Sequence, residues 1–203
     1  MTAHIGIILA AGRGRRMGGG KQVATCQTAD GPKALVAAAY DSISSICDSM
    51  TVVLGHDADV VAAALGDRSF HRVLADPDAP MFDSIRVGLL AASRVNAAAT
   101  LVLQPGDHPE VGAATLEVLA DSSKKHPAQA VIPQIAKSGG HPIFVPPAVA
   151  AKLVMLDCPG GLGEFWQSHP ELCIRIPVDD SSVLHDVDTP ADLMRKPRQS
   201  NSH

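Results

Sequence analysis

A glycine-rich, strongly basic loop near the N-terminus is the first segment of the sequence that could do chemistry. It spans residues 9–21 and reads LAAGRGRRMGGGK, with five glycines and four cationic side chains. Glycines let backbone amides approach phosphate oxygens closely, and Arg or Lys side chains neutralise the charge that amides alone cannot balance. The loop therefore predicts a phosphate site, with a solvated basic turn as the alternative.

The established phosphate-loop fingerprints do not fit this loop. A dinucleotide-binding GxGxxG pattern would need glycine where Met17 stands, and a Walker A loop would need glycine at Arg15 and Ser or Thr at Gln22. The loop nevertheless follows residues 5–9, an apolar run typical of a strand buried on both faces. Because ligands of open α/β sheets bind beyond the carboxyl ends of strands, this position favours a phosphate site over a plain turn.

Two further segments carry carboxylates that could face the same site. Asp107 follows an expected strand at residues 100–103, although residues 104–107 also have good turn chemistry. Asp186 and Asp188 alternate along an extended segment, so their side chains point the same way and could face one ion. Asp188 or Thr189 could instead cap the helix that Pro190 begins, and Thr189 is available for that role.

Regularly alternating strands and helices must position these groups. Apolar residues show helical spacing over residues 33–47 and in a stripe formed by Phe82, Ile85, Leu89 and Ala92. The alternation predicts an α/β fold: a three-layer, Rossmann-like, mostly parallel sheet with helices on both faces. After Pro133 the pattern breaks into short elements. We expect strands at residues 5–9, 51–54, 72–75, 100–103, 130–132 and 172–178, and further helices at 57–65, 111–120 and from Pro190.

Composition excludes several classes of protein. Of the 203 residues 46% are hydrophobic and 19% charged, which is typical of a packed domain, and 3% aromatic content disfavours an all-β fold. No apolar run approaches the roughly 20 residues that cross a bilayer, and a net charge of -4 gives no general attraction to nucleic acid. We expect one domain over residues 1–195, a disordered tail over 196–203, and a soluble, cytoplasmic protein without nucleic-acid or membrane partners.

The loop pattern Leu-Ala-Ala-Gly-x-Gly-x-Arg-Met-Gly, followed by Lys, resembles the signature loop of the MobA-like nucleotidyltransferases. Their nearest branch is that of the molybdenum cofactor cytidylyltransferases, because Ala10-Ala11-Gly12 is similar to the cytidylyl loop whereas the guanylyl branch tends to carry a second glycine. The resemblance implies a fold of the nucleotide-diphospho-sugar transferase type. Segments that match in the same order are residues 53–56, 84–88, 106–109, 140–142 and 186–190.

This resemblance also implies a reaction and a set of site residues. A phosphate oxygen of an acceptor, such as molybdopterin, would attack the α-phosphorus of CTP, and pyrophosphate would leave without a protein nucleophile. A molybdoenzyme or its chaperone would be a transient partner. Arg16, Lys21 and Asp107 would be catalytic, and Asp107 with Asp188 would hold Mg²⁺. Nucleotide-binding residues would be Leu9, Ala10, Ala11, Gly12, Gly14, Arg16, Gly18, Lys21 and His141, although a His that follows glycine is more often a plain loop residue.

Departures from the family pattern concentrate on the acceptor side. Residues 22–29 are polar and Pro32-Lys33 reverses the family's Lys-Pro order, which predicts a displaced Lys33. Residues 80–84 read Pro-Met-Phe-Asp-Ser instead of Gly-Met-x-Ser-Ser, and residues 158–163 lack an Asp and an Arg that bidentate anion recognition would use. Three alternatives therefore stay open: a guanylyltransferase, a sugar-phosphate nucleotidyltransferase, and a non-catalytic nucleotide- or cofactor-binding homologue.

Overall fold

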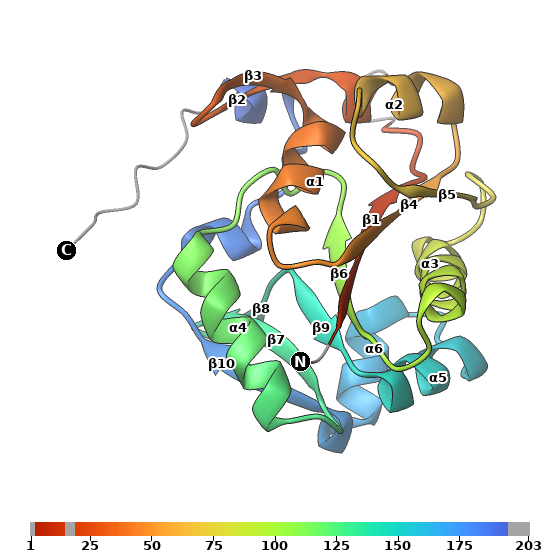
Figure 1. Ribbon diagram of the computed structural model, residues 1–203, viewed down its shortest axis with the longest axis vertical. Helices are drawn as coiled ribbons and strands as arrows, with labels where there is room; N and C mark the ends of the chain where they lie inside the picture. The colour runs from red at the N-terminus through yellow and green to blue at the C-terminus, as the bar shows by residue number, and fades with distance from the viewer. Residues whose placement is uncertain (1–2, 15–18, 195–203) are drawn as a thin grey trace.

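A twisted, mostly parallel sheet forms the centre of the computed structural model, which describes residues 3–14 and 19–194 (Figure 1). Its strands pair in the order β10-β7-β9-β6-β1-β4-β5, and β8 pairs with β7. β9 is antiparallel to β6 and β7, and β8 is antiparallel to β7. The strands are β1 (His4–Ala10), β4 (Ser49–Leu54), β5 (His71–Leu74), β6 (Thr100–Pro105), β7 (Ala130–Ile135), β8 (Ser138–Gly139), β9 (Ile143–Val145) and β10 (Cys173–Pro177).

Helices cover both faces of this sheet. Successive strand residues point to opposite faces, so Ile7 of β1 belongs to one buried cluster and Ile8 to the other. The first cluster packs against α3 (Met81–Val95), α5 (Pro147–Met155) and α6 (Gly161–Ser168), and the second against α1 (Leu35–Ser44), α2 (Ala58–Ala64) and α4 (Ala113–Lys125). The three-layer α/β fold is therefore confirmed. The short helices are α7 (Pro190–Leu193), η2 (Lys21–Val23), η3 (Pro170–Leu172) and η4 (Ser181–Leu184).

The largest difference from the sequence prediction lies between the loop and the first helix. The helix expected at residues 33–47 begins at Leu35 and ends at Ser44, because the preceding residues form a hairpin. In that hairpin β2 (Thr25–Thr28) pairs antiparallel with β3 (Gly31–Ala34), and Cys26 lies opposite Lys33. The polar segment that interrupts the family pattern is thus a two-stranded ribbon.

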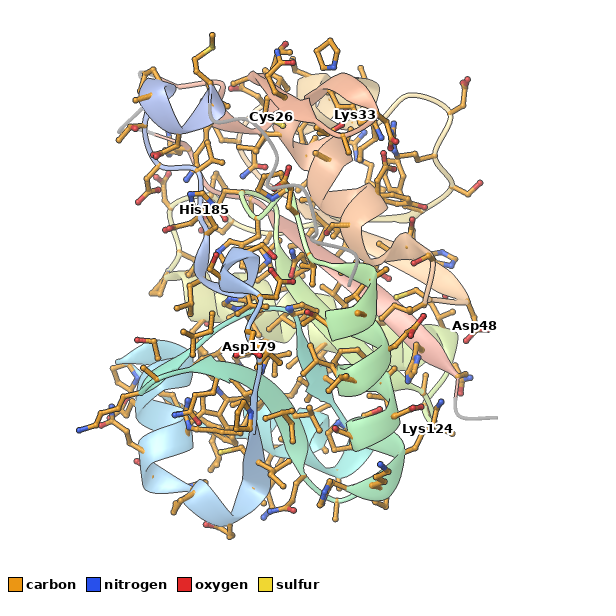
Figure 2. The ribbon with its side chains drawn as sticks, turned by 90° about the vertical axis from the view of Figure 1, so that its left-hand side faces the viewer. Cys26, Lys33, Asp48, Lys124, Asp179 and His185 are labelled. Carbon is orange, nitrogen blue, oxygen red and sulfur yellow. The ribbon has the colours of Figure 1, made fainter. Side chains whose placement is uncertain are left out.

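This hairpin holds the C-terminal segment in place. Cys26 is 3% exposed and clusters with Leu35 and Ala38 of α1 and with Val187. Figure 2 shows the C-terminal segment around His185 running toward the end of the molecule where Cys26 and Lys33 lie. Burial of these small apolar side chains fixes Val187, and with it the backbone on either side of Val187.

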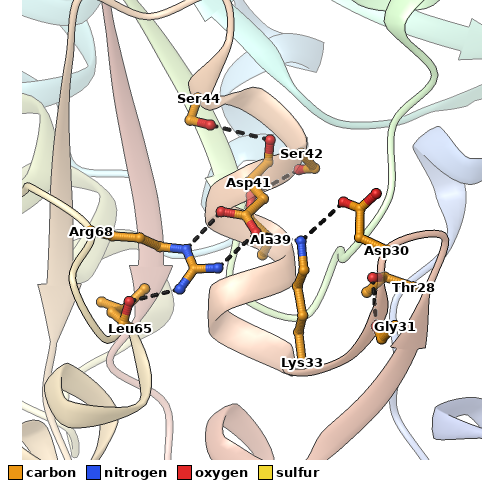
Figure 3. Close-up of polar contacts among 10 residues, drawn as sticks. All are labelled: Thr28, Asp30, Gly31, Lys33, Ala39, Asp41, Ser42, Ser44, Leu65 and Arg68. Carbon is orange, nitrogen blue, oxygen red and sulfur yellow. Dashed lines mark hydrogen bonds and ion pairs between the residues drawn. The ribbon is translucent and has the colours of Figure 1, made fainter.

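A group of charged side chains fastens the hairpin to α1 and to the loop after α2 (Figure 3). Asp41 accepts from Arg68 Nε at 2.6 Å and Nη2 at 2.8 Å, and from Lys33 Nζ at 2.8 Å. The Lys33 ammonium also donates to Asp30 at 3.2 Å, and Arg68 Nη1 donates to the Leu65 carbonyl at 2.7 Å. Lys33 is thus committed to this network.

No helix in the described part of the chain is both long and apolar enough to cross a membrane.

Candidate functional site

The carboxyl ends of the central strands meet where the glycine-rich loop begins. The chain passes from β1 to β4 on one side and later returns to β6 on the other, so the strand order reverses between β1 and β6. At that point the Gly106 N–H donates to the Leu9 carbonyl at 2.8 Å, and a Cβ on Gly55 would lie 2.5 Å from the Ala11 oxygen. Such a reversal point is where open α/β sheets bind ligands.

The described part of the loop has the backbone conformation that its glycines allow. Leu9 and Ala10 end β1, Ala10 and Ala11 are buried, and Gly12 is exposed. Gly14 has a φ of 59°, and the N–H of Gly19 donates to its carbonyl at 3.2 Å, which closes the loop. The predicted Arg16 and Gly18 lie outside the described residues. The remaining residues of the prediction, Leu9, Ala10, Ala11, Gly12 and Gly14, lie at the end of β1 and in the loop that follows it.

Lys21 joins the loop to both predicted carboxylates. Its Nζ lies 2.7 Å from Asp107 Oδ2 and 2.7 Å from Asp188 Oδ1, and its side chain is only 10% exposed. The stem passes close to the loop, because a Cβ on Gly14 would lie 2.5 Å from Lys21 Cβ. The structure thus brings together three residues that the sequence placed in one site.

Electrostatics keep this lysine charged. Burial is the largest single effect on the pKa of Lys21 and lowers it. The hydrogen bonds to Asp107 and Asp188 and the negative charges of these residues together raise the pKa by more, so it lies above its ordinary 10.5. An ammonium between two carboxylates also removes the repulsion between them. Lys21 is therefore a cation at neutral pH.

Backbone contacts bring Asp188 to Asp107. The Val187 N–H donates to the carbonyl of Asp107 at 2.9 Å, which ties the C-terminal segment to the turn after β6. Thr189 and Asp192 form a capping box at α7, as expected from the sequence, so Asp188 is not needed as the cap. Asp186 is exposed, and it is Asp188 that hydrogen-bonds to Lys21.

Two histidines pack against each other at the turn that carries Asp107. The rings of His108 and His141 are 5.1 Å apart between centroids, at 72°, and the His141 N–H donates to the Val183 carbonyl at 2.8 Å. Burial, with a smaller effect of His108, lowers the pKa of His141 to about 3, and burial also lowers the pKa of His108. Both rings are therefore neutral near pH 7 and could offer hydrogen bonds without adding charge.

The sequence reasoning missed two buried glutamines behind Asp107. Gln22 is 8% exposed, and a Cβ on Gly106 would lie 2.6 Å from its Oε1. Gln104 is fully buried and donates to the His108 carbonyl at 2.9 Å. Both support the turn that carries Asp107. The signal available for Gln22 in the sequence was a polar residue directly after the loop lysine, but periodicity cannot show that such a residue is buried.

Side chains near the expected acceptor face are held by other parts of the protein. Arg13 pairs with Asp78, which follows β5, and Arg86 Nε donates to the Val154 carbonyl at 3.0 Å. Asp83, in the first turn of α3, is 3.7 Å from Arg86 Nη1. The region therefore presents a carboxylate where the family pattern has serine.

The donor set suits a hard divalent cation that shares its shell with a substrate. Within the described ranges no group of three or more His, Cys, Asp or Glu is arranged to hold a metal ion. Asp107 and Asp188, however, direct two carboxylate oxygens at one cationic group. Mg²⁺ typically takes one or two carboxylates and fills its remaining positions with water and phosphate oxygens. Two carboxylates beside a phosphate loop fit that requirement.

The chain matches one protein family and several solved structures. Residues 6–172 match the MobA-like NTP transferase domain. Rv0371c from Mycobacterium tuberculosis H37Rv is 28% identical over 94% of this chain and 96% of that chain, with a TM-score of 0.78, and its complex with manganese has a TM-score of 0.74. A nucleotidyl transferase from Methanothermobacter thermautotroptrophicus, Mth528, is 21% identical over 95% and 94% of the two chains, with a TM-score of 0.74.

No curated protein matches the chain. The family match nevertheless spans most of the sequence, from β1 to η3. It includes the loop, Lys21 and Asp107, whereas Asp188 lies beyond its end. The chain belongs to the family of MobA-like NTP transferase domains.

Proposed function

We propose that this protein is a Mg²⁺-dependent nucleotidyltransferase that transfers a nucleoside monophosphate, CMP from CTP, to a phosphorylated acceptor and releases pyrophosphate. The convergence of Asp107 and Asp188 on Lys21 beside the phosphate loop carries this proposal. Carboxylates next to a triphosphate are useful only when a cation lies between them. The manganese complex of Rv0371c supports a divalent ion in a relative.

Each residue of the group has a task in this reaction. Amides of Gly12 and Gly14 would bind phosphate oxygens, and Lys21 would stabilise the charge that develops at the α-phosphate. Arg16 is assigned to the triphosphate on the loop pattern alone. Asp107 and Asp188 would hold Mg²⁺, which neutralises phosphate charge and aligns nucleotide and acceptor.

The chemical step itself needs no protein nucleophile. An acceptor phosphate oxygen forms a bond to the α-phosphorus while the bond to the β-bridging oxygen breaks, and pyrophosphate leaves with that electron pair. The site residues bind and orient the two substrates. His141, neutral and next to His108, would contact the nucleotide or acceptor by hydrogen bonding.

The base and the acceptor rest on the resemblance of Ala10-Ala11-Gly12 to the cytidylyl branch, which points to molybdopterin as the acceptor and to a molybdoenzyme or its chaperone as the recipient. A second candidate acceptor is a sugar phosphate, because Asp83 in the first turn of α3 stands where the family pattern has serine, and this acceptor-side segment therefore departs from the pattern of the pterin-binding branch. GTP as the donor and a non-catalytic nucleotide-binding role are the remaining alternatives.

Thermal stabilisation separates these possibilities. We expect CTP with Mg²⁺ to raise the melting temperature more than GTP, ATP or UTP, and we expect little effect without Mg²⁺. Preference for GTP would reassign the donor. Pyrophosphate release with candidate acceptors then tests turnover: Asp107→Asn should remove most of it while the protein remains folded. Unchanged turnover in that variant would rule out the role of Asp107.

A further inference from the structure

The ammonium of Lys21 lies where one cation bridges two carboxylates. It is 2.7 Å from Asp107 Oδ2 and 2.7 Å from Asp188 Oδ1, so these two oxygens are no farther apart than twice that distance. The three side chains are 10%, 25% and 33% exposed for Lys21, Asp107 and Asp188. Water alone therefore does not screen the two negative charges, and Lys21 balances them.

We propose that Lys21 is an internal counter-ion, which holds the two carboxylates in the metal-free protein and releases both of them when a divalent cation binds. This inference rests on the proposed function, because it takes Asp107 and Asp188 as the metal ligands. It assigns Lys21 two successive positions: one between the carboxylates and one beside the nucleotide phosphates.

The two cations exclude each other for a physical reason. A divalent ion held between Asp107 and Asp188 would take the position that the Lys21 ammonium now holds, 2.7 Å from one oxygen of each carboxylate. Two positive charges in one partly buried space also repel each other strongly. Metal binding therefore has to break both hydrogen bonds of the ammonium.

The path of the lysine stem determines where the released ammonium goes. Lys21 Cβ packs against Gly14, and the N–H of Gly19 closes the loop on the carbonyl of Gly14. An ammonium that leaves the carboxylates therefore stays next to the loop that would bind phosphate. The exchange makes metal binding the step that frees Lys21 for the nucleotide.

This exchange is tested by calorimetry, which measures the affinity of variants of the protein for Mn²⁺ in the absence of nucleotide. Lys21→Met keeps the length of the stem and removes the charge, so the metal-free variant should melt at a lower temperature but bind Mn²⁺ about tenfold more tightly, within the range of typical coupling between sites. Lys33→Met is the matched control, since Lys33 also bridges two carboxylates, Asp30 and Asp41. Its Mn²⁺ affinity should equal that of the wild type.

A second measurement uses the unaltered protein. Amine acetylation followed by mass spectrometry should modify Lys21 slowly without metal and several-fold faster with saturating Mn²⁺, while the rate at Lys33 should stay constant. Equal or weaker Mn²⁺ binding by Lys21→Met, or metal-independent acetylation of Lys21, would overturn the exchange. Mn²⁺ binding that Asp107→Asn leaves unchanged would instead remove the metal role from the proposed function.

Discussion

The backbone N–H of Val187 donates to the carbonyl oxygen of Asp107 at 2.9 Å. This bond links the turn after β6 to the C-terminal segment. Asp107 itself and Asp188, the neighbour of Val187, are the two residues whose carboxylates accept from Lys21. The separation of the two carboxylates is therefore set by the backbone as well as by the lysine between them. A site built in this way can exchange its cation without losing its shape.

Asp188 and Asp186 form a matched pair for testing the second carboxylate. Asp188→Asn should lower turnover on the order of 100-fold, because it removes a charge that the metal and Lys21 both use. Asp186→Asn should leave turnover near that of the wild type, since Asp186 is exposed and it is Asp188 that bonds Lys21. Steady-state pyrophosphate release measures both, and the reverse ranking would exchange the two assignments.

Gly14 and Gly12 separate backbone strain from phosphate contact. Gly14→Ala should destabilise the protein by about 1–2 kcal/mol, because its φ of 59° disfavours a side chain and the new Cβ would lie 2.5 Å from Lys21 Cβ. Gly12→Ala meets nothing within 4 Å and should keep its stability. Chemical denaturation gives the stabilities. Weaker stabilisation of the Gly12→Ala variant by nucleotide with Mg²⁺ would indicate phosphate contact at that amide, and unchanged stabilisation would argue against it.

Val187 links hairpin packing to the geometry of the site. Val187→Ala should cost about 1–2 kcal/mol, because this side chain is 5% exposed and packs with Cys26 and Leu35. It should also lower turnover, since the neighbouring Asp188 loses its support. Val60→Ala is the control, at 57% exposure, and should change neither quantity. A stable, fully active Val187→Ala protein would show that the hairpin does not support the site.

Asp41 predicts how stability depends on acid. The hydrogen bonds from Arg68 hold the pKa of Asp41 below its ordinary 3.8, and Lys33 lowers it further. Burial acts in the opposite direction but is the smaller effect. Its contribution is thus complete above the unfolded value and is lost as the pH falls through the folded one. Asp41→Asn should lower the free energy of unfolding by about 1–2 kcal/mol at pH 7, and the gap to the wild type should narrow below about pH 4.

Denaturation curves from pH 7 down to about pH 3 measure that gap. Asp30→Asn serves as the control, because Asp30 is 81% exposed and Lys33 retains Asp41 without it. If the difference in free energy of unfolding between Asp41→Asn and the wild type stayed constant down to acid pH, the ionised form of Asp41 would not be what stabilises the protein.

Apolar runs made the central strands predictable, and spacing predicted α3. β1, β4 and β6 are short, and all but one residue of each is buried, so their apolar sequences are typical of central strands. The β2–β3 hairpin was missed because its residues are polar and only Cys26 is buried, and β9 was missed because three residues show no period. The bond between Lys21 and Asp188 joins residues 167 apart in sequence, and such a contact depends on the whole path of the chain. The sequence could name both partners but could not show that they touch.

The reversed direction of β9 has a consequence for how this scaffold can change. The parallel strands β1 and β6 deliver residues to the site from the loops that follow them, whereas β9 runs the other way and places His141, in the loop that precedes it, beside His108. Lengthening the chain just before Ile143 would therefore reshape the rim on which the glycine-rich loop and Asp107 lie. Lengthening it just after Val145 would alter only the opposite rim, where α5 begins. One inverted strand thus gives the fold a segment in which recognition can diversify while the phosphate loop and its carboxylates stay as they are.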